Sequence, residues 1–196
     1  MFEPVMPQEI GRATPAERPA LAFPKDAGYA YRNTRYACLY GAAAPEGKAA
    51  MTNPSNHIPH VDWERVDPED LSLPDSRRWL DYWRSLAEES GAPPSRERLN
   101  VIGDRPALAP LLLWAEVLED GDYLYRVMGE LVRHYVGFSL KGKKLSDIDL
   151  NGSDGFIARK YAEAVSTGRP VCSRGRYGFG DRSVAREAVV MPFAEP

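Results

Sequence analysis

Three histidines are the side chains of this sequence best suited to acid–base or metal chemistry. His57 and His60 stand three residues apart, but the proline between them prevents a helix that would point both imidazoles at one metal ion, and no pair of cysteines or histidines follows. A general base at His134 would need a carboxylate such as Asp147 or Asp149 at about 2.6–3.2 Å. The sequence therefore predicts no metal site, and it leaves a small α+β enzyme with His134 as its base as an alternative function.

The remaining nucleophiles and glycine-rich segments match no catalytic or nucleotide-binding motif. Cys172 falls within an expected strand, where a cysteine usually serves as a small buried hydrophobe. The glycine-rich residues 175–180 lie between two expected strands instead of before a helix, so they predict a hairpin turn and not a phosphate-binding loop. There is no Gly-x-Ser-x-Gly elbow, Walker loop or dinucleotide fingerprint. This pattern favours a protein that binds over one that catalyses.

The charge balance excludes wholesale electrostatic binding of nucleic acid or of an anionic membrane. The 196 residues carry 25 Lys and Arg against 28 Asp and Glu, a net charge of −3, and the basic residues within 141–144 and 159–160 lack the interleaved aromatic side chains that stack on bases. The longest apolar stretch, residues 108–117, is far shorter than the roughly 20 residues that span a bilayer. Two cysteines, Cys38 and Cys172, cannot form a disulfide framework and suit a reducing compartment. We therefore expect a cytoplasmic protein with no nucleic-acid and no membrane partner.

Proline is concentrated in the first third of the chain. Eight of the 17 prolines precede residue 60, and each removes an amide donor and restricts the residue before it. Residues 1–70 are therefore expected to form a largely irregular or disordered leader, with Met51 as an alternative start. Tyrosines between Tyr29 and Tyr40 are unusual for a solvated leader, so an ordered extension or a partner-binding arm remains the second interpretation of this segment.

After the leader, the apolar pattern predicts a folded domain over residues 75–193. It opens with a helix over residues 75–90, indicated by three large aromatic residues at helical spacing, with Asp75 or Ser76 as its N-cap. Glycine and two prolines follow and end the helix. Three aromatic side chains on one helix face require a surface to pack against, so we expect this flanking helix to dock on the domain.

The rest of the domain alternates between strand-like and helix-like segments. Two runs over residues 111–118 and 123–128, with a glycine-containing turn between them, predict an antiparallel hairpin. The later segments predict helices over residues 130–135, 145–148 and 156–167, then strands over residues 171–177 and 185–193. Hairpins on both sides of a helical block indicate an α+β fold with an antiparallel sheet.

A set of short motifs in this domain resembles a known family. The motifs are Trp79-Leu-Asp-Tyr-Trp83, Gly91 with Pro94, Tyr125-Arg126 with Gly129, Tyr135-Val-Gly137, Leu140-Lys-Gly142 and Val189-Val-Met-Pro192. In their order and spacing they resemble short, stand-alone bacterial PAS-like proteins, over residues 77–193. Each motif alone is weak, and the specificity lies in the set.

The resemblance implies a five-stranded antiparallel sheet with short helices and one longer helix on one face. The strands at 111–118, 123–128, 171–177 and 185–193 would be the first four strands of that fold. A PAS sheet has a fifth strand that pairs with the first near the middle of the sheet, and this sequence reaches Pro196 directly after the fourth. We therefore expect the fifth strand to be missing, or to be replaced by residues 29–40, by a partner chain or by a second copy.

The resemblance also implies a function without catalysis. PAS modules hold a small molecule in the cleft between sheet and helices, or relay a signal to a partner, so we expect a sensor or interaction module of bacterial signalling. Its partner would be an unidentified signalling protein, or a second copy in a homodimer. A haem would require a histidine on the long helix and a flavin adduct would require an Asn-Cys-Arg segment, so no cofactor is expected, and the ligand is expected to be a carboxylate-bearing or apolar metabolite. The other alternative is a truncated, inactive PAS remnant. The implied ligand-binding residues are Arg126, His134, Tyr135, Tyr161 and Arg176.

Overall fold

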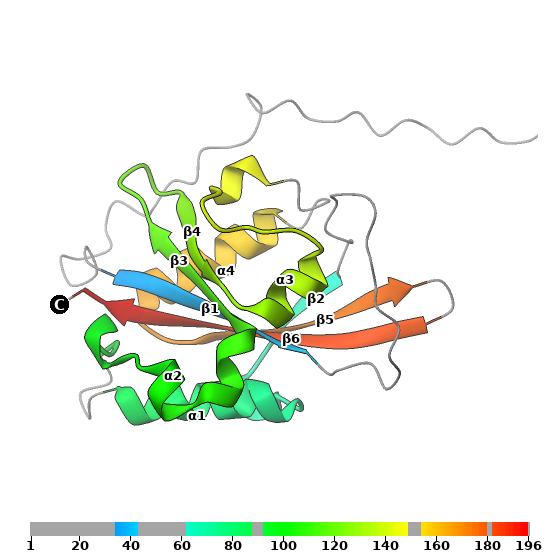
Figure 1. Cartoon of the computed structure of the whole chain (residues 1–196), viewed down its shortest axis with the longest axis horizontal. Coiled ribbons are helices and arrows are strands. Elements are labelled where there is room, and N and C mark those ends of the chain that lie inside the picture. Colours follow the sequence, from blue (N-terminus) through cyan, green and yellow to red (C-terminus); the bar gives the residue numbers. More distant parts are fainter. Residues whose placement is uncertain (1–33, 43–61, 88–91, 149–153, 180–181, 196) are drawn as a thin grey trace, which may run out of the picture.

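The computed structural model describes residues 34–42, 62–87, 92–148, 154–179 and 182–195. It is a mixed α+β fold with an antiparallel sheet between helices (Figure 1). In chain order, its elements are β1 (Thr34–Ala42), β2 (Asp62–Val66), η3 (Pro68–Asp70), α1 (Pro74–Leu86), η4 (Arg96–Arg98), α2 (Val101–Asp104), η5 (Pro106–Leu111), β3 (Leu112–Val117), β4 (Tyr123–Met128), α3 (Glu130–Val136), η6 (Leu145–Asp147), α4 (Asp154–Thr167), β5 (Val171–Phe179) and β6 (Arg182–Ala194).

The strand order within the sheet is β2-β5-β6-β1-β3-β4, and every neighbouring pair is antiparallel. Strands β3 and β4 form one hairpin, while β2, β5 and β6 form a three-stranded unit. Strand β1 joins these two groups, because Tyr36 stands opposite both Ala115 of β3 and Pro192 of β6. The predicted strands at 111–118, 123–128, 171–177 and 185–193 correspond to β3, β4, β5 and β6, and the antiparallel sheet is confirmed.

Two strands lie within residues 1–70, where the sequence predicted an irregular leader. The reason is local, because no proline occurs between Pro24 and Pro45, or between Pro59 and Pro68. Each interval is long enough for one uninterrupted strand, and the first contains tyrosine and threonine, which strands favour. The sequence suggested that the sheet lacks the strand next to β3. In the structure β1 occupies this position, and it overlaps residues 29–40, which were one of the three expected replacements. Met51 lies outside the described residues.

Helices cover both faces of the sheet. On one face, α3, η6 and α4 pack on a core that includes Leu113, Tyr123 and Tyr161. On the other face, α1, α2 and η5 pack on a second core that includes Trp79 and Met191. Figure 1 shows α1 and α2 on one side of the strands and α4 on the other. The predicted flanking helix therefore docks on the sheet face opposite the long helix α4.

The start of α1 differs from the predicted capping by Asp75 or Ser76. The helix begins at Pro74, whose missing N–H is no loss in the first turn, and no side chain of the helix caps it. The carboxylate of Glu187 in β6 instead accepts the backbone N–H groups of Ser72 and Leu73, the two residues before the helix, at 2.8 and 3.0 Å. Residues just before α1 are thus tied directly to the sheet.

Candidate ligand-binding site

A β-bulge in the β3–β4 hairpin creates the site. Trp114 pairs with Val127, but its neighbour Ala115 pairs with Tyr125, so Arg126 is the extra residue on β4. In a regular strand, Arg126 and Val127 would face opposite sides of the sheet. The bulge leaves both side chains exposed, 52% for Arg126 and 46% for Val127, and both line the same groove. The irregularity therefore places a guanidinium beside an apolar side chain on one face of the hairpin.

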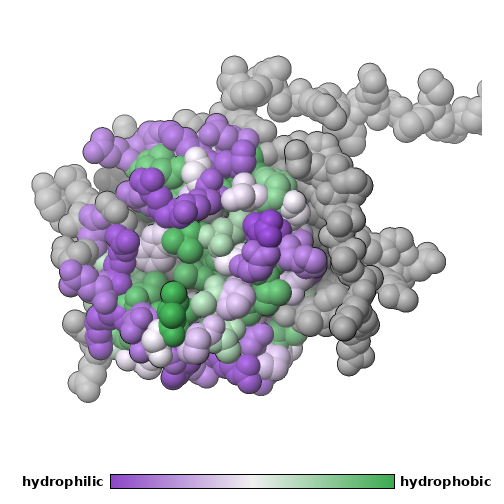
Figure 2. Space-filling model, in the orientation of Figure 1, coloured by the Kyte–Doolittle hydropathy of each residue, from purple (hydrophilic) through white to green (hydrophobic). Residues whose placement is uncertain are grey.

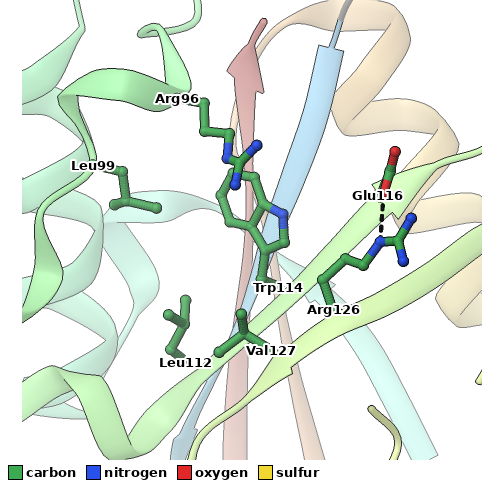
Figure 3. A pocket seen from close by; sticks show the side chains of 7 residues that line it. All are labelled: Arg96, Leu99, Leu112, Trp114, Glu116, Arg126 and Val127. Atoms are coloured by element: carbon green, nitrogen blue, oxygen red, sulfur yellow. Dashed lines mark hydrogen bonds and ion pairs between the residues drawn. The ribbon is translucent and has the colours of Figure 1, made fainter. Parts of the chain in front are cut away.

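The groove lies between the hairpin and the segment that leads into α2 (Figure 3). Its volume is about 360 Å³. The indole of Trp114 forms one wall and packs on Phe193 with ring centroids 5.6 Å apart, so its position is fixed by the core. The side chains that line the groove are Arg96, Leu99, Leu112, Trp114, Glu116, Arg126 and Val127.

Two guanidinium groups and one carboxylate determine the electrostatics of the groove. Arg126 Nε donates to Glu116 Oε2 at 2.5 Å, and the Arg126 side chain is 52% exposed whereas that of Glu116 is 15% exposed. The Arg96 guanidinium lies 5.6 Å from the centroid of the Trp114 ring, and no carboxylate among the described residues pairs with it. The groove thus carries a net positive charge beside an aromatic and aliphatic surface, which suits a small molecule with a carboxylate and a flat or apolar body.

The surrounding surface is partly apolar. Figure 2 shows a band of hydrophobic residues across the middle of this face, bordered by hydrophilic residues. Among the described residues, the large apolar side chains that are exposed are Ile102, Val127 and Leu131. Val127 lines the groove, so the solvent-exposed part of the groove includes an apolar side chain as well as charged ones.

The structure places Tyr161 in the core between the sheet and α4. Its side chain is fully buried on α4, its hydroxyl lies 3.3 Å from the hydroxyl of Tyr125, and its ring meets that of Tyr123 edge to face at 4.8 Å. Burial raises the pKa of Tyr123 well above its ordinary value. These tyrosines pack against one another between the sheet and α4, the region in which the PAS resemblance implied a ligand.

The other predicted residues lie apart from Arg126. Tyr135 is half-buried on α3, and the buried guanidinium of Arg186 lies 3.7 Å from its ring centroid. His134 is exposed, with its ring 6.1 Å from that of Tyr135, and Arg176 is exposed on β5 opposite Ala185. Of the five predicted residues, the structure brings only Arg126 into the groove.

The residues that accompany Arg126 in the groove are not evident in the sequence. Arg96 and Leu99 come from η4 and the residue that follows it, some 30 positions earlier, and the pattern around Trp114 indicates only a buried strand. In the sequence, the run Tyr-Leu-Tyr-Arg-Val-Met shows regular alternation with Tyr123, Tyr125 and Val127 on one face, whereas in the structure both tyrosines are buried and Val127 is exposed. The exposure of Val127 reflects the bulge, and the bulge itself is identified by the pairing of β4 with β3.

The remaining candidates for acid–base, metal and nucleophilic chemistry lie apart from the groove or outside the described residues. His134 makes no hydrogen bond to a described carboxylate or hydroxyl, and Asp147 is exposed on η6. Asp149, His57 and His60 lie outside the described residues, within which no group of three or more His, Cys, Asp or Glu could hold a metal ion. Cys172 is 1% exposed, and burial raises the pKa of its thiol to about 12, so it is not a nucleophile at neutral pH.

Among the described residues, no helix is long and apolar enough to cross a membrane. Comparison of the chain with protein-family models, with curated proteins and with solved structures finds no match. The fold and the groove are therefore the features that bear on function.

Proposed function

We propose that this protein is a PAS-type sensor or interaction module that binds a carboxylate-bearing small molecule in the groove beside Trp114 and acts without catalysis. The observation that carries the proposal is the bulge, which brings Arg126 to an aromatic wall next to a second guanidinium from Arg96. A carboxylate held by a guanidinium fork, with an apolar body against an indole, is the ligand geometry that these groups favour.

The strand order supports the PAS part of the proposal. In a PAS sheet the fifth strand pairs with the first near the middle, and here β1 stands between β3 and β6, the counterparts of the first and fourth strands. Short helices and one longer helix, α3, η6 and α4, lie in sequence between β4 and β5, as that fold requires. In this proposal β1 is supplied from the N-terminal side of the domain and takes the place of the fifth strand.

The position of the groove distinguishes this module from one that holds its ligand beneath the long helix. The groove lies over Trp114, which belongs to the core shared with α1. A ligand there would contact the hairpin and the loop before α2 together, because Arg96 and Arg126 come from these two segments. Binding would thus fix the outer helical layer to the edge of the sheet, and the fixed surface would be presented to a signalling partner or to a second copy.

The experiment is a binding screen on the full chain with benzoate, indole-3-acetate and butyrate, followed by calorimetry and Trp emission. At least one carboxylate is expected to bind, and Arg126→Gln should weaken it by about tenfold or more, because a hydrogen bond to a charged group contributes about 1.5–3 kcal/mol. Arg78→Gln is the matched control, since Arg78 is 65% exposed on α1 and outside the groove. Equal affinity of Arg126→Gln and the unsubstituted protein, or no binding by any of the carboxylates, would contradict the proposal.

A further inference from the structure

The groove beside Trp114 has a charged end and an aliphatic end. Around the indole, the charged side chains of the lining lie towards the upper right of Figure 3: Arg96, Glu116 and Arg126. The aliphatic side chains of the lining lie towards the lower left: Leu99, Leu112 and Val127. This division along one groove suits a ligand that is itself charged at one end and apolar at the other.

The charged end has one more guanidinium than its own carboxylate can balance. Arg126 is paired with Glu116, whereas the exposed guanidinium of Arg96 lies over Trp114 and has no carboxylate partner among the described residues. One carboxylate on the ligand would therefore balance the charges at this end of the groove. A second carboxylate would leave an excess of negative charge beside Glu116 and would weaken binding, so a monocarboxylate is expected.

The two segments that form the aliphatic end also carry exposed apolar side chains outside the groove. Ile102, three residues after Leu99, is 80% exposed on α2, and Leu131, four residues after Val127, is 39% exposed on α3. With Val127 they are the large apolar side chains that are exposed among the described residues. The groove itself, at about 360 Å³, is small for a ligand pocket, so a longer apolar chain would extend towards these residues.

We propose that the ligand of the groove is a straight-chain aliphatic monocarboxylate longer than butyrate, such as hexanoate or octanoate. Its carboxylate binds at the guanidinium groups of Arg96 and Arg126, and its chain passes Trp114 and leaves the groove at the aliphatic end. An unbranched chain fits this end because its lining is aliphatic and offers no second ring for an aromatic body to stack on. This inference rests on the proposed function, since it names the class of carboxylate that the same groove binds.

Calorimetry on the full chain with sodium butyrate, hexanoate and octanoate tests the length of the chain. The affinity should rise about twofold to fourfold with each added methylene, because each one buried contributes up to about 0.8 kcal/mol, a factor of about four. Octanoate should bind more tightly than benzoate or indole-3-acetate. Octylammonium chloride has the same tail and the opposite charge, and it should bind at least about tenfold more weakly than octanoate.

Two variants test where the chain lies. Ile102→Ser and Leu131→Ser remove exposed apolar side chains outside the groove. Together they should weaken octanoate several-fold and leave butyrate unchanged, because butyrate is too short to reach beyond the groove. Arg78→Gln on the surface of α1 is the control, and it should change neither affinity.

The outcomes separate this inference from the proposed function. If Arg126→Gln weakens butyrate but octanoate binds no more tightly than butyrate, the groove binds carboxylates and the inference about the chain is overturned. The same holds if an aromatic acid binds more tightly than octanoate, if octylammonium binds as well as octanoate, or if the double variant Ile102→Ser with Leu131→Ser keeps the full affinity for octanoate. If no carboxylate of either series binds, the inference and the proposed function are both overturned.

Discussion

Removal of the Glu187 carboxylate should destabilise the protein more than removal of any of its exposed carboxylates. The Glu187 side chain is completely buried in β6, and its two oxygens accept from the Ser72 amide and hydroxyl, the Leu73 amide and the Arg174 guanidinium, at 2.7–3.2 Å. These bonds join β6 to the segment before α1 and to the neighbouring strand β5. Glu187→Ala would leave two backbone amides without their acceptor and would remove the carboxylate partner of the Arg174 guanidinium, which keeps a hydrogen bond to the Asp70 carbonyl.

The magnitude follows from those lost partners. Breaking a buried ion pair by removing one member costs about 3–5 kcal/mol, and Arg174 is 30% exposed, so water relieves part of its cost. We expect a loss of about 3 kcal/mol in the free energy of unfolding for Glu187→Ala. For a chain of this length, that corresponds to a fall of roughly 6–12 °C in the melting temperature. Glu187→Gln keeps one acceptor oxygen and should lose about half as much.

The same group predicts a pH dependence. Burial alone would raise the pKa of Glu187, but the hydrogen bonds from Ser72, Leu73 and Arg174 outweigh it, and the pKa is lowered from 4.5. A carboxyl whose pKa is depressed on folding contributes stability that is complete above its unfolded pKa and is lost as the pH falls through its folded pKa. The stability difference between the unsubstituted protein and Glu187→Gln should therefore be constant near neutral pH and shrink below pH 4.5.

Urea unfolding at a series of pH values, followed by far-ultraviolet circular dichroism, measures both effects. Glu130→Gln is the matched control, because Glu130 is an exposed carboxylate that pairs with Arg133 on the surface of α3. Its midpoint should stay close to that of the unsubstituted protein. A Glu187→Ala protein within about 0.5 kcal/mol of the unsubstituted one, or a difference for Glu187→Gln that does not change with pH, would refute the reasoning.

Two further substitutions test the sheet and the hairpin. Leu39→Pro removes a backbone donor from β1, which is paired on both sides at this position, and should cost about 3 kcal/mol or more in urea unfolding; an unchanged midpoint would show that β1 does not hold the two halves of the sheet together. Gly129→Ala places a Cβ 2.3 Å from the carbonyl oxygen of Pro110, a backbone atom that cannot move aside cheaply, and should cost about 1–3 kcal/mol. Gly142→Ala is its control, because a Cβ there meets no atom within 4 Å and the only cost is the φ of +81°, about 1 kcal/mol; a smaller loss for Gly129→Ala than for Gly142→Ala would contradict the steric argument.

Most elements between residues 74 and 194 are predictable from the sequence because their signals are local, but the short helices η4, α2 and η5 were not predicted. The glycine of the β3–β4 turn, the left-handed Gly137 after α3 and the helical period of α4 each depend on a few neighbouring residues. The strands before residue 70 were not predicted, since the high proline density of the whole segment hides the proline-free intervals within it. A strand is central because distant segments pair with both of its edges. The sequence of Thr34–Ala42 alone does not indicate that β3 and β6 are its partners.

The candidate site was predictable only in part, for the same reason. Arg126 is notable in the sequence as a cation in a strand, but its direction depends on a bulge that exists only in the register between β3 and β4. Tyr161 is a ligand-binding candidate in the sequence because of its residue type alone. In the structure it packs against Tyr123 and Tyr125 in the core. In the sequence Lys160 belongs to a basic cluster typical of a solvated surface, whereas the rings of Trp63 and Phe156 enclose it in the fold.

The most direct test of the groove is residue-resolved mapping of a bound carboxylate. Backbone amide spectra of ¹⁵N-labelled full-length protein are recorded during a titration with the tightest binder of the carboxylate screen. We expect the largest shifts on Trp114, Arg126 and Val127 and on Arg96 from the facing segment, and we expect them to vanish in Arg126→Gln. Shifts centred instead on Tyr161 and its neighbours beneath α4 would show that the ligand enters the core side of the sheet, and would contradict the groove as the binding site.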